Sequence, residues 1–185
     1  RISMHRFFLN SNDAVIDAVI KYIRGHPCSK SKVTLQNFIQ ENITLLDYSN
    51  KVNTEKLITT GELYDLTSLY DEINQEYFNS SLKIHITWYG ERYHKHKSSV
   101  TFGQYDNFLK MIKMHRILDQ ALFPKFFVCF TLYHEMLHHI IPPTIDQKGQ
   151  VCYHNAEFKL REKQFKDYRK ARSWELTNRN RFFHF

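Results

Sequence analysis

The chain has 185 residues, of which 42% are hydrophobic and 15% aromatic, and its formal net charge is +7. This composition excludes a disordered or fibrous protein, and the length is that of one domain with a small helical extension. Three cysteines without a CxxC pair exclude a disulfide framework and a zinc ribbon, and they favour a reducing cytoplasm. We expect neither a signal peptide nor a membrane span, because no apolar run is long enough.

Apolar residues at helical spacing predict two N-terminal helices, over residues 11–24 and 33–46. Ser11 or Asn12 can cap the first helix. The polar segment 47–54 follows the second helix and is the best candidate for a boundary. We therefore expect a helical extension over residues 1–58 and a separate domain over residues 59–185.

The second part of the chain mixes helical and alternating patterns. Thr59 and Glu62 match a capping box, which predicts a helix from there to about Phe78. Alternating and β-prone segments predict three strands, at residues 83–89, 99–105 and 109–115. Residues 124–141 predict a buried helix that ends at a double proline, and residues 155–174 predict one long last helix. The expected fold is α+β, with a sheet of about three strands packed on helices.

The buried helix carries the sequence Tyr133-His-Glu-Met-Leu-His-His139, which contains His-Glu-x-x-His. Residues four apart lie on the same face of a helix, so His134 and His138 can bind one ion. Glu135 lies about 100° round the helix, where it can contact a water on that ion. Polar groups on a core helix are costly unless they are paired or bind a metal. The motif therefore predicts a single zinc ion.

A catalytic zinc typically has three protein ligands, so a third must come from elsewhere. His139 is adjacent to His138 and points in another direction. The downstream candidates are His154, Glu157 and Asp146. We favour His154, because it falls where a loop meets the last helix, and Glu157 is the second choice.

Several pieces of the chain together resemble the SprT-like zinc metalloproteases, a Spartan-related family of zincins. They are residues 69–78, the strand that ends at Trp88 with the basic loop after it, residues 133–138, and His154-Asn-Ala-Glu-Phe158. The resemblance implies a zincin-like metalloendopeptidase with His134, His138 and His154 as zinc ligands and Glu135 as the catalytic base. The resemblance also implies a role in the repair of DNA–protein crosslinks. This chain departs from many members in having Asn155 after the third histidine and no cysteines for a C-terminal zinc ribbon.

Basic residues suggest a nucleic-acid partner. Residues 159–181 contain nine Lys or Arg against three Asp or Glu, which favours polyanions. In the basic loop, the expected contacts to single-stranded DNA are Arg92, His94, Lys95 and Lys97. A nucleoid or nuclear association would then accompany the cytoplasmic location. The alternative function is a DNA-associated or structural zinc-binding module without protease activity, and an aminopeptidase is the third choice.

Overall fold

The structure is a computed structural model, and it describes residues 2–43, 46–92 and 100–178. The chain forms two compact units, one of residues 1–46 with 142–155 and the other of residues 47–141 with 156–185. This division differs from the expected boundary at residue 58. A later segment joins the first unit because its strand β4 packs against helix α2. In the part of the chain that is described, each helix is too short or too polar to cross a membrane.

The first unit contains two helices and a short hairpin. Its elements are η1 (Arg6–Asn10), α1 (Asp13–Ile23), α2 (Ser29–Ile43), β4 (Thr144–Ile145) and β5 (Val151–Cys152). Both predicted helices are present, although α2 begins at Ser29 rather than at the predicted residue 33. The Asn12 side chain caps α1 by accepting a hydrogen bond of 3.0 Å from the Val15 N–H. Strands β4 and β5 pair antiparallel, in a segment for which the sequence analysis predicted no strand.

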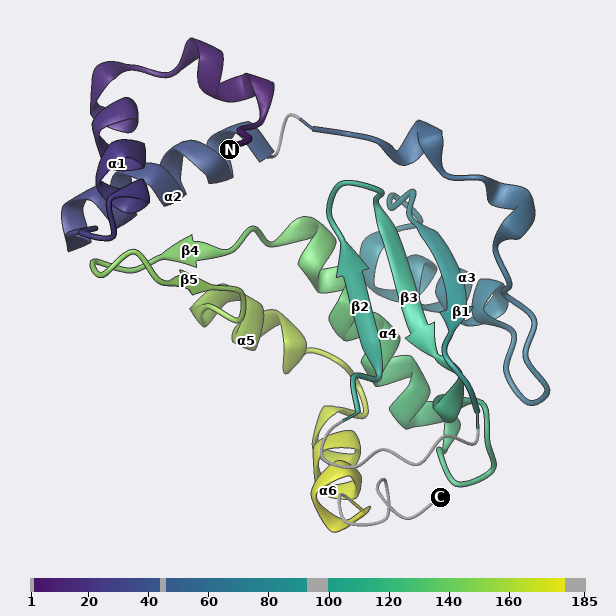
Figure 1. The fold of residues 1–185 in the computed structure, drawn as a ribbon. Coiled ribbons are helices and arrows are strands. Elements are labelled where there is room, and N and C mark those ends of the chain that lie inside the picture. The colour runs from purple at the N-terminus through teal and green to yellow at the C-terminus, as the bar shows by residue number, and fades with distance from the viewer. Residues whose placement is uncertain (1, 44–45, 93–99, 179–185) are drawn as a thin grey trace. The chain divides into compact units, whose positions relative to one another are not determined.

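The second unit is a three-stranded sheet with helices packed on it. Its elements are η2 (Ser49–Lys51), η3 (Thr54–Lys56), α3 (Leu66–Phe78), β1 (His85–Tyr89), β2 (Gly103–Asp106), β3 (Met111–His115), η4 (Arg116–Leu118), α4 (Lys125–Ile140), α5 (Ala156–Glu162) and α6 (Tyr168–Asn178). The strand order is β1-β3-β2, with β1 parallel and β2 antiparallel to β3. Helices α3 and α4 cover the same face of the sheet (Figure 1). The mixed α+β class and the small sheet are thus confirmed.

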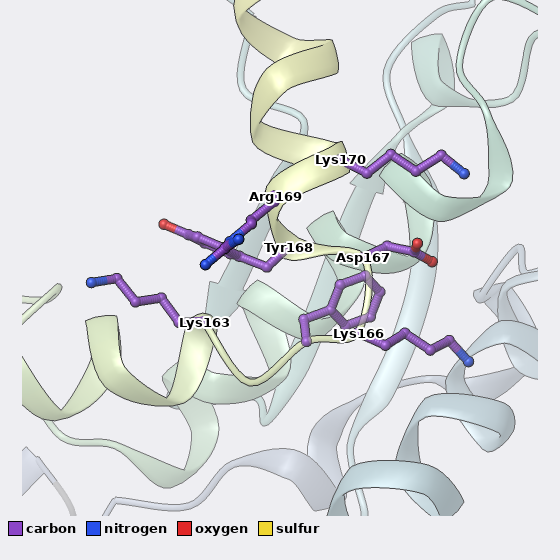
Figure 2. A pocket seen from close by; sticks show the side chains of 7 residues that line it. Lys163, Lys166, Asp167, Tyr168, Arg169 and Lys170 are labelled. Atoms are coloured by element: carbon purple, nitrogen blue, oxygen red, sulfur yellow. The ribbon is translucent and has the colours of Figure 1, made fainter.

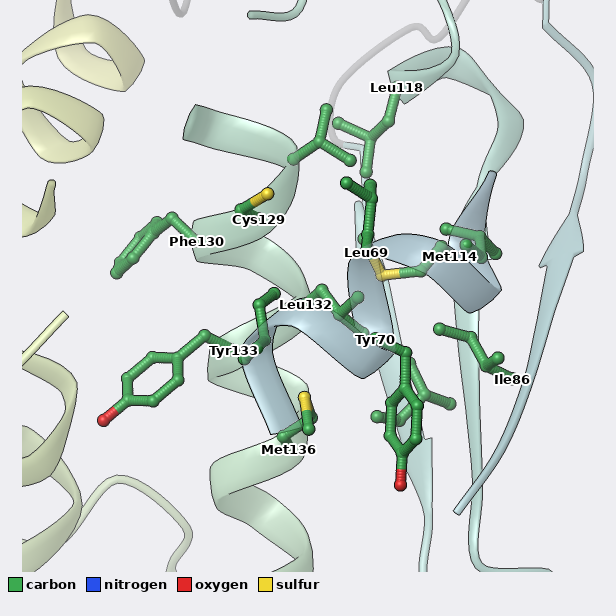
Figure 3. Close-up of a cluster of buried hydrophobic side chains, with 14 of the residues drawn as sticks. Leu69, Tyr70, Ile86, Met114, Leu118, Cys129, Phe130, Leu132, Tyr133 and Met136 are labelled. Atoms are coloured by element: carbon green, nitrogen blue, oxygen red, sulfur yellow. The ribbon is translucent and has the colours of Figure 1, made fainter. Parts of the chain in front are cut away.

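The core of this unit lies between the sheet and these two helices (Figure 3). The sheet contributes Ile86, Trp88 and Met114, and none of these side chains is more than 6% exposed. Helix α4 is buried on most of its circumference, as its almost unbroken apolar sequence predicts. Polar side chains on α4 therefore lie in a largely apolar, rigid setting.

Helix α3 begins later than the capping box predicted, and that prediction was wrong. Its N-cap is Asp65, whose carboxylate accepts a hydrogen bond of 2.8 Å from the Ser68 N–H. The preceding residues 62–64 instead donate their three backbone N–H groups to the buried carboxylate of Asp119. The Asp119 carboxylate accepts hydrogen bonds from three backbone N–H groups, which is more than a capping box at Thr59 would satisfy, so this arrangement is favoured over a helix that begins there.

The prediction of one long last helix was also wrong, because the chain breaks between α5 and α6. Phe165, in the break, is 2% exposed and its ring packs against Tyr77, Phe130 and Tyr133. The Tyr77 hydroxyl accepts a hydrogen bond of 3.0 Å from the Lys166 N–H. Burial of this large aromatic ring offsets the helical hydrogen bonds that the break removes.

Candidate metal centre

Helix α4 presents two imidazoles on one face, as its sequence predicted. The ring centroids of His134 and His138 are 5.0 Å apart and the rings meet edge to face. Both side chains are partly exposed, although the rest of this part of the helix is buried. Phe158, on α5, packs its ring 4.9 Å from that of His134 and 4.6 Å from that of His138. The two histidines are therefore held against an apolar wall while they keep an open side.

His154 precedes α5 by two residues and joins the two histidines of α4. The donor nitrogen atoms of His134, His138 and His154 lie within 4.8 Å of one another, close enough to hold one metal ion. Of the His, Cys, Asp and Glu side chains in the described ranges, only these three converge in such a group, which contains neither Glu157 nor Asp146.

Glu162 supports this site, and the sequence analysis missed it. Its carboxylate lies 2.7 Å from Nδ1 of His134, and the residue is 9% exposed. A carboxylate on one imidazole nitrogen orients the ring and directs the other nitrogen toward a metal. The spacing in the sequence could have identified Glu162, because it follows Phe158 by four residues and so lies on the same face of α5. An acidic residue on a buried helix face needs a partner, and His134 is that partner.

The donor set fits zinc on its chemistry. Three imidazoles, one of them oriented by a carboxylate, match the ligands of catalytic zinc sites, which keep a fourth position for water or substrate. The partial exposure of His134 and His138 and the exposure of His154 leave access to that position. Carboxylate-preferring ions such as Mg²⁺ and Ca²⁺ fit less well, because none of the three converging groups is an oxygen donor.

Glu135 turns its carboxylate toward strand β2. The residue is 6% exposed, and burial raises the pKa of its carboxyl group to about 7, against the smaller lowering effects of the His134 charge and a hydrogen bond from the Tyr105 backbone. Gly103, on β2, makes this position possible, since a Cβ atom there would lie 2.7 Å from Cγ and Oε1 of Glu135. A carboxyl group with a pKa near neutrality can both take up and release a proton.

His139 takes no part in this group, as expected from its direction on the helix. Its Nδ1 lies 2.7 Å from the hydroxyl of Tyr105. Burial is the main cause that lowers its pKa. The contact joins α4 to β2 near the carboxylate of Glu135, so it helps to fix the distance between helix and strand.

Of the four predicted nucleic-acid contacts, the structure describes Arg92 alone. His94, Lys95 and Lys97 lie outside the described residues. Arg92 is described, and its guanidinium is paired with the carboxylates of Asp119 and Glu62 while its side chain is 12% exposed. These pairs give Arg92 a structural role beside the turn at residues 62–64, and its contact with DNA stays a prediction.

Basic side chains also surround the turn between α5 and α6 (Figure 2). They line a cavity of about 540 Å³ together with Phe165, Asp167 and Tyr168, and they are Lys163, Lys166, Arg169 and Lys170. Lys166 also pairs with Glu76 at 2.8 Å, and Lys170 lies over the ring of Phe126. The cavity has four cations against one carboxylate in its lining, so it favours anions.

Comparison of the chain with protein-family models, with curated proteins and with solved structures finds no match in any of the three.

Proposed function

We propose that this chain is a zinc-dependent metalloendopeptidase with Glu135 as its general base. The arrangement on α4 carries the proposal. His134 is oriented by Glu162, His138 follows one helical turn later, and the buried carboxylate of Glu135 faces the edge of the sheet. The position of His154 supports a set of three imidazole ligands, which is typical of catalytic rather than structural zinc.

The chain's own residues have distinct tasks in such a reaction. When bound, zinc lowers the pKa of water to about 7 and polarises the substrate carbonyl. Glu135 accepts the proton of the attacking water and then delivers it to the leaving amine. Burial raises the pKa of its carboxyl group in the metal-free chain, which makes the carboxylate a better proton acceptor. Gly103 keeps space for the carboxylate, and Glu162 keeps the His134 ring in position.

Strand β2 is the expected docking place for an extended substrate. Among the described strands it pairs with β3 alone, so it forms an edge of the sheet. The His115 N–H donates to the Phe102 carbonyl at 2.8 Å, which makes these residues a hydrogen-bonded pair. By the alternation of an antiparallel ladder, the backbone groups of Gly103 and Tyr105 face away from β3. The Tyr105 N–H already donates to the Glu135 carboxylate, so a substrate would pair with the Gly103 groups and the Tyr105 carbonyl. A substrate can pair with this edge regardless of most of its side chains.

The motifs shared with SprT-like proteases support a narrower proposal, that the substrates are proteins bound to DNA. The basic cavity between α5 and α6 favours a polyanion as partner. The same cavity favours the second candidate function, a DNA-associated zinc-binding module without protease activity. Hydrolysis of an unfolded protein distinguishes the two candidates. An increase of that hydrolysis by single-stranded DNA, abolished by high salt, would support the narrower proposal.

The first experiment is elemental analysis of zinc per chain in the parent, in His154→Ala and in Glu157→Ala. We expect about one zinc in the parent and in Glu157→Ala, and a marked loss in His154→Ala. The second experiment is hydrolysis of unfolded casein by the zinc-loaded parent and by Glu135→Gln. The variant should keep its zinc and lose hydrolysis. Cleavage at the parental rate by Glu135→Gln would refute the mechanism, and a parent that binds no zinc would refute the site.

A further inference from the structure

Helix α1 has two apolar faces, and α2 packs on one of them (Figure 1). Val15 and Ala18 lie on the covered face and are 3% and 2% exposed. The other face carries Ile16, Ile20 and Ile23, which are 37%, 39% and 50% exposed. Residues four and then three apart lie along one line of a helix, so these three side chains form a continuous strip. We call this strip the isoleucine stripe.

The isoleucine stripe has the spacing of a seam between two helices. Apolar side chains at alternating intervals of three and four residues are those by which one helix packs along another. With a rotation of about 100° per residue, the three isoleucines fall within an arc of about 60°. Such a narrow arc fits one partner helix, whereas a helix that lies in a membrane surface presents a wider apolar face. The stripe therefore favours a helical protein partner.

Two opposite charges flank the isoleucine stripe on the same side. Asp17 lies about 60° and Arg24 about 40° beyond Ile20 round the helix. Both residues are exposed, and Arg24 still has helical backbone angles, with φ −74° and ψ −2°. Asp17 precedes Ile20 by three residues and Arg24 follows it by four. Along the helix axis, the acid and the base are therefore about 4.5 and 6 Å from Ile20, in opposite directions.

This arrangement is complementary to itself when two α1 helices pack antiparallel about a twofold axis at Ile20. The axis places Ile20 against its own copy and Ile16 against Ile23 of the second chain. The same rotation brings the charged flanks of both helices together in opposite directions. Asp17 of one chain then lies level with Arg24 of the other to within about 1.5 Å, and the pair forms twice. A parallel pair brings opposite flanks together and does not join these two charges.

We infer that the isoleucine stripe is a dimerisation surface, on which a second copy of this chain packs its own α1 antiparallel. The stripe supplies the apolar contact, and Asp17 and Arg24 select the antiparallel orientation. Three isoleucines on each side make a small interface, so the dimer is weak and depends on concentration. The surface contains no residue of the candidate metal centre, so dimerisation does not depend on the proposed peptidase function.

Sedimentation equilibrium of the full chain, at about 5 to 500 μM, measures the association. We expect a monomer–dimer equilibrium in the parent. Ile20→Ser should raise the dissociation constant at least about tenfold, because the apolar contact at the axis is lost from both chains. Tyr22→Ser is the control, since this residue is 61% exposed on another side of α1, and it should keep the parental constant. Circular dichroism checks that each variant is folded.

Charge reversal tests the antiparallel orientation. Asp17→Arg places two arginines together at each pair, and Arg24→Asp places two aspartates together, so each variant alone should lose the dimer. An equal mixture of the two variants should recover it as a heterodimer, because every charge at position 17 then faces an opposite charge at position 24. Lys21→Asp changes the charge as much as Arg24→Asp does, but on the side of α1 away from the stripe, and should leave the dimer intact.

The outcomes separate the possible partners of the stripe. A parent that stays monomeric at every concentration would overturn the inference, as would a mixture of Asp17→Arg and Arg24→Asp that stays monomeric. Dimers of Asp17→Arg as stable as those of the parent would overturn the antiparallel arrangement. If the monomeric parent instead bound vesicles of phosphatidylglycerol, and Ile20→Ser did not, the stripe would belong to a membrane surface and the dimer would be refuted.

Discussion

The burial of Glu135 makes a quantitative prediction for the metal-free chain. The carboxyl group has a pKa of about 7 in the folded protein, against an ordinary value of 4.5. Each unit of difference corresponds to about 1.4 kcal/mol, so the folded state loses about 3 kcal/mol when this group ionises. Because the residue is only 6% exposed, solvent does little to screen this cost.

The sign of the pH dependence follows from the raised pKa. Between pH 4.5 and 7 the folded chain holds the Glu135 proton more strongly than the unfolded chain does. The favourable contribution of this proton is complete below pH 4.5 and is lost as the pH rises through 7. Glutamine stays neutral throughout. Glu135→Gln should therefore raise the free energy of unfolding by about 3 kcal/mol at pH 8 and change it little at pH 4.

Urea unfolding of the metal-free parent and variant at both pH values measures this difference. Contributions to stability that the two proteins share cancel in the comparison. Glu157→Gln is the matched control, because it makes the same substitution at an exposed residue of α5. Zinc should reduce the difference, because a nearby cation stabilises the ionised carboxylate. An equal free energy of unfolding for parent and Glu135→Gln at pH 8, or the same gain at pH 4 as at pH 8, would refute the reasoning.

Three further substitutions test other parts of the site. Glu162→Gln should weaken zinc binding by about 10- to 100-fold, because the carboxylate that orients His134 is lost. A competition titration with a chelator measures the zinc affinity, and an unchanged affinity would argue against this role of Glu162. Gly103→Ala places a methyl group against Glu135, so hydrolysis should fall sharply while zinc per chain stays constant. Asp119→Ala leaves three backbone N–H groups and Arg92 without their carboxylate, so thermal or urea unfolding should show a loss of about 3–5 kcal/mol, and a loss below 1 kcal/mol would contradict this account.

Local patterns in the sequence determined the elements that depend on local forces. The apolar run and the double proline predicted α4, and the alternation before Tyr89 predicted β1. The spacing of His134 and His138 put both rings on one face, because helical geometry is the same in every protein. His154 was chosen from three candidates on its place in the chain, and its donor atom does lie with the other two.

Tertiary contacts determined the helix boundaries that local sequence patterns predicted wrongly. The capping box at Thr59 lost to Asp119, a carboxylate more than fifty residues away that accepts three backbone N–H groups. The helix breaks at Phe165 because the ring packs in a buried position that it could not reach from a continuous helix.

The partners of His134 and Glu135 also depend on tertiary structure. Glu162 meets His134 because α5 packs on α4, and Gly103 lies against Glu135 because β2 is the strand nearest that helix. Spacing along a chain determines which side chains share a face. Long-range packing determines which elements lie against that face. The pKa of Glu135 therefore depends on long-range packing too, because burial and charge act through space rather than along the sequence.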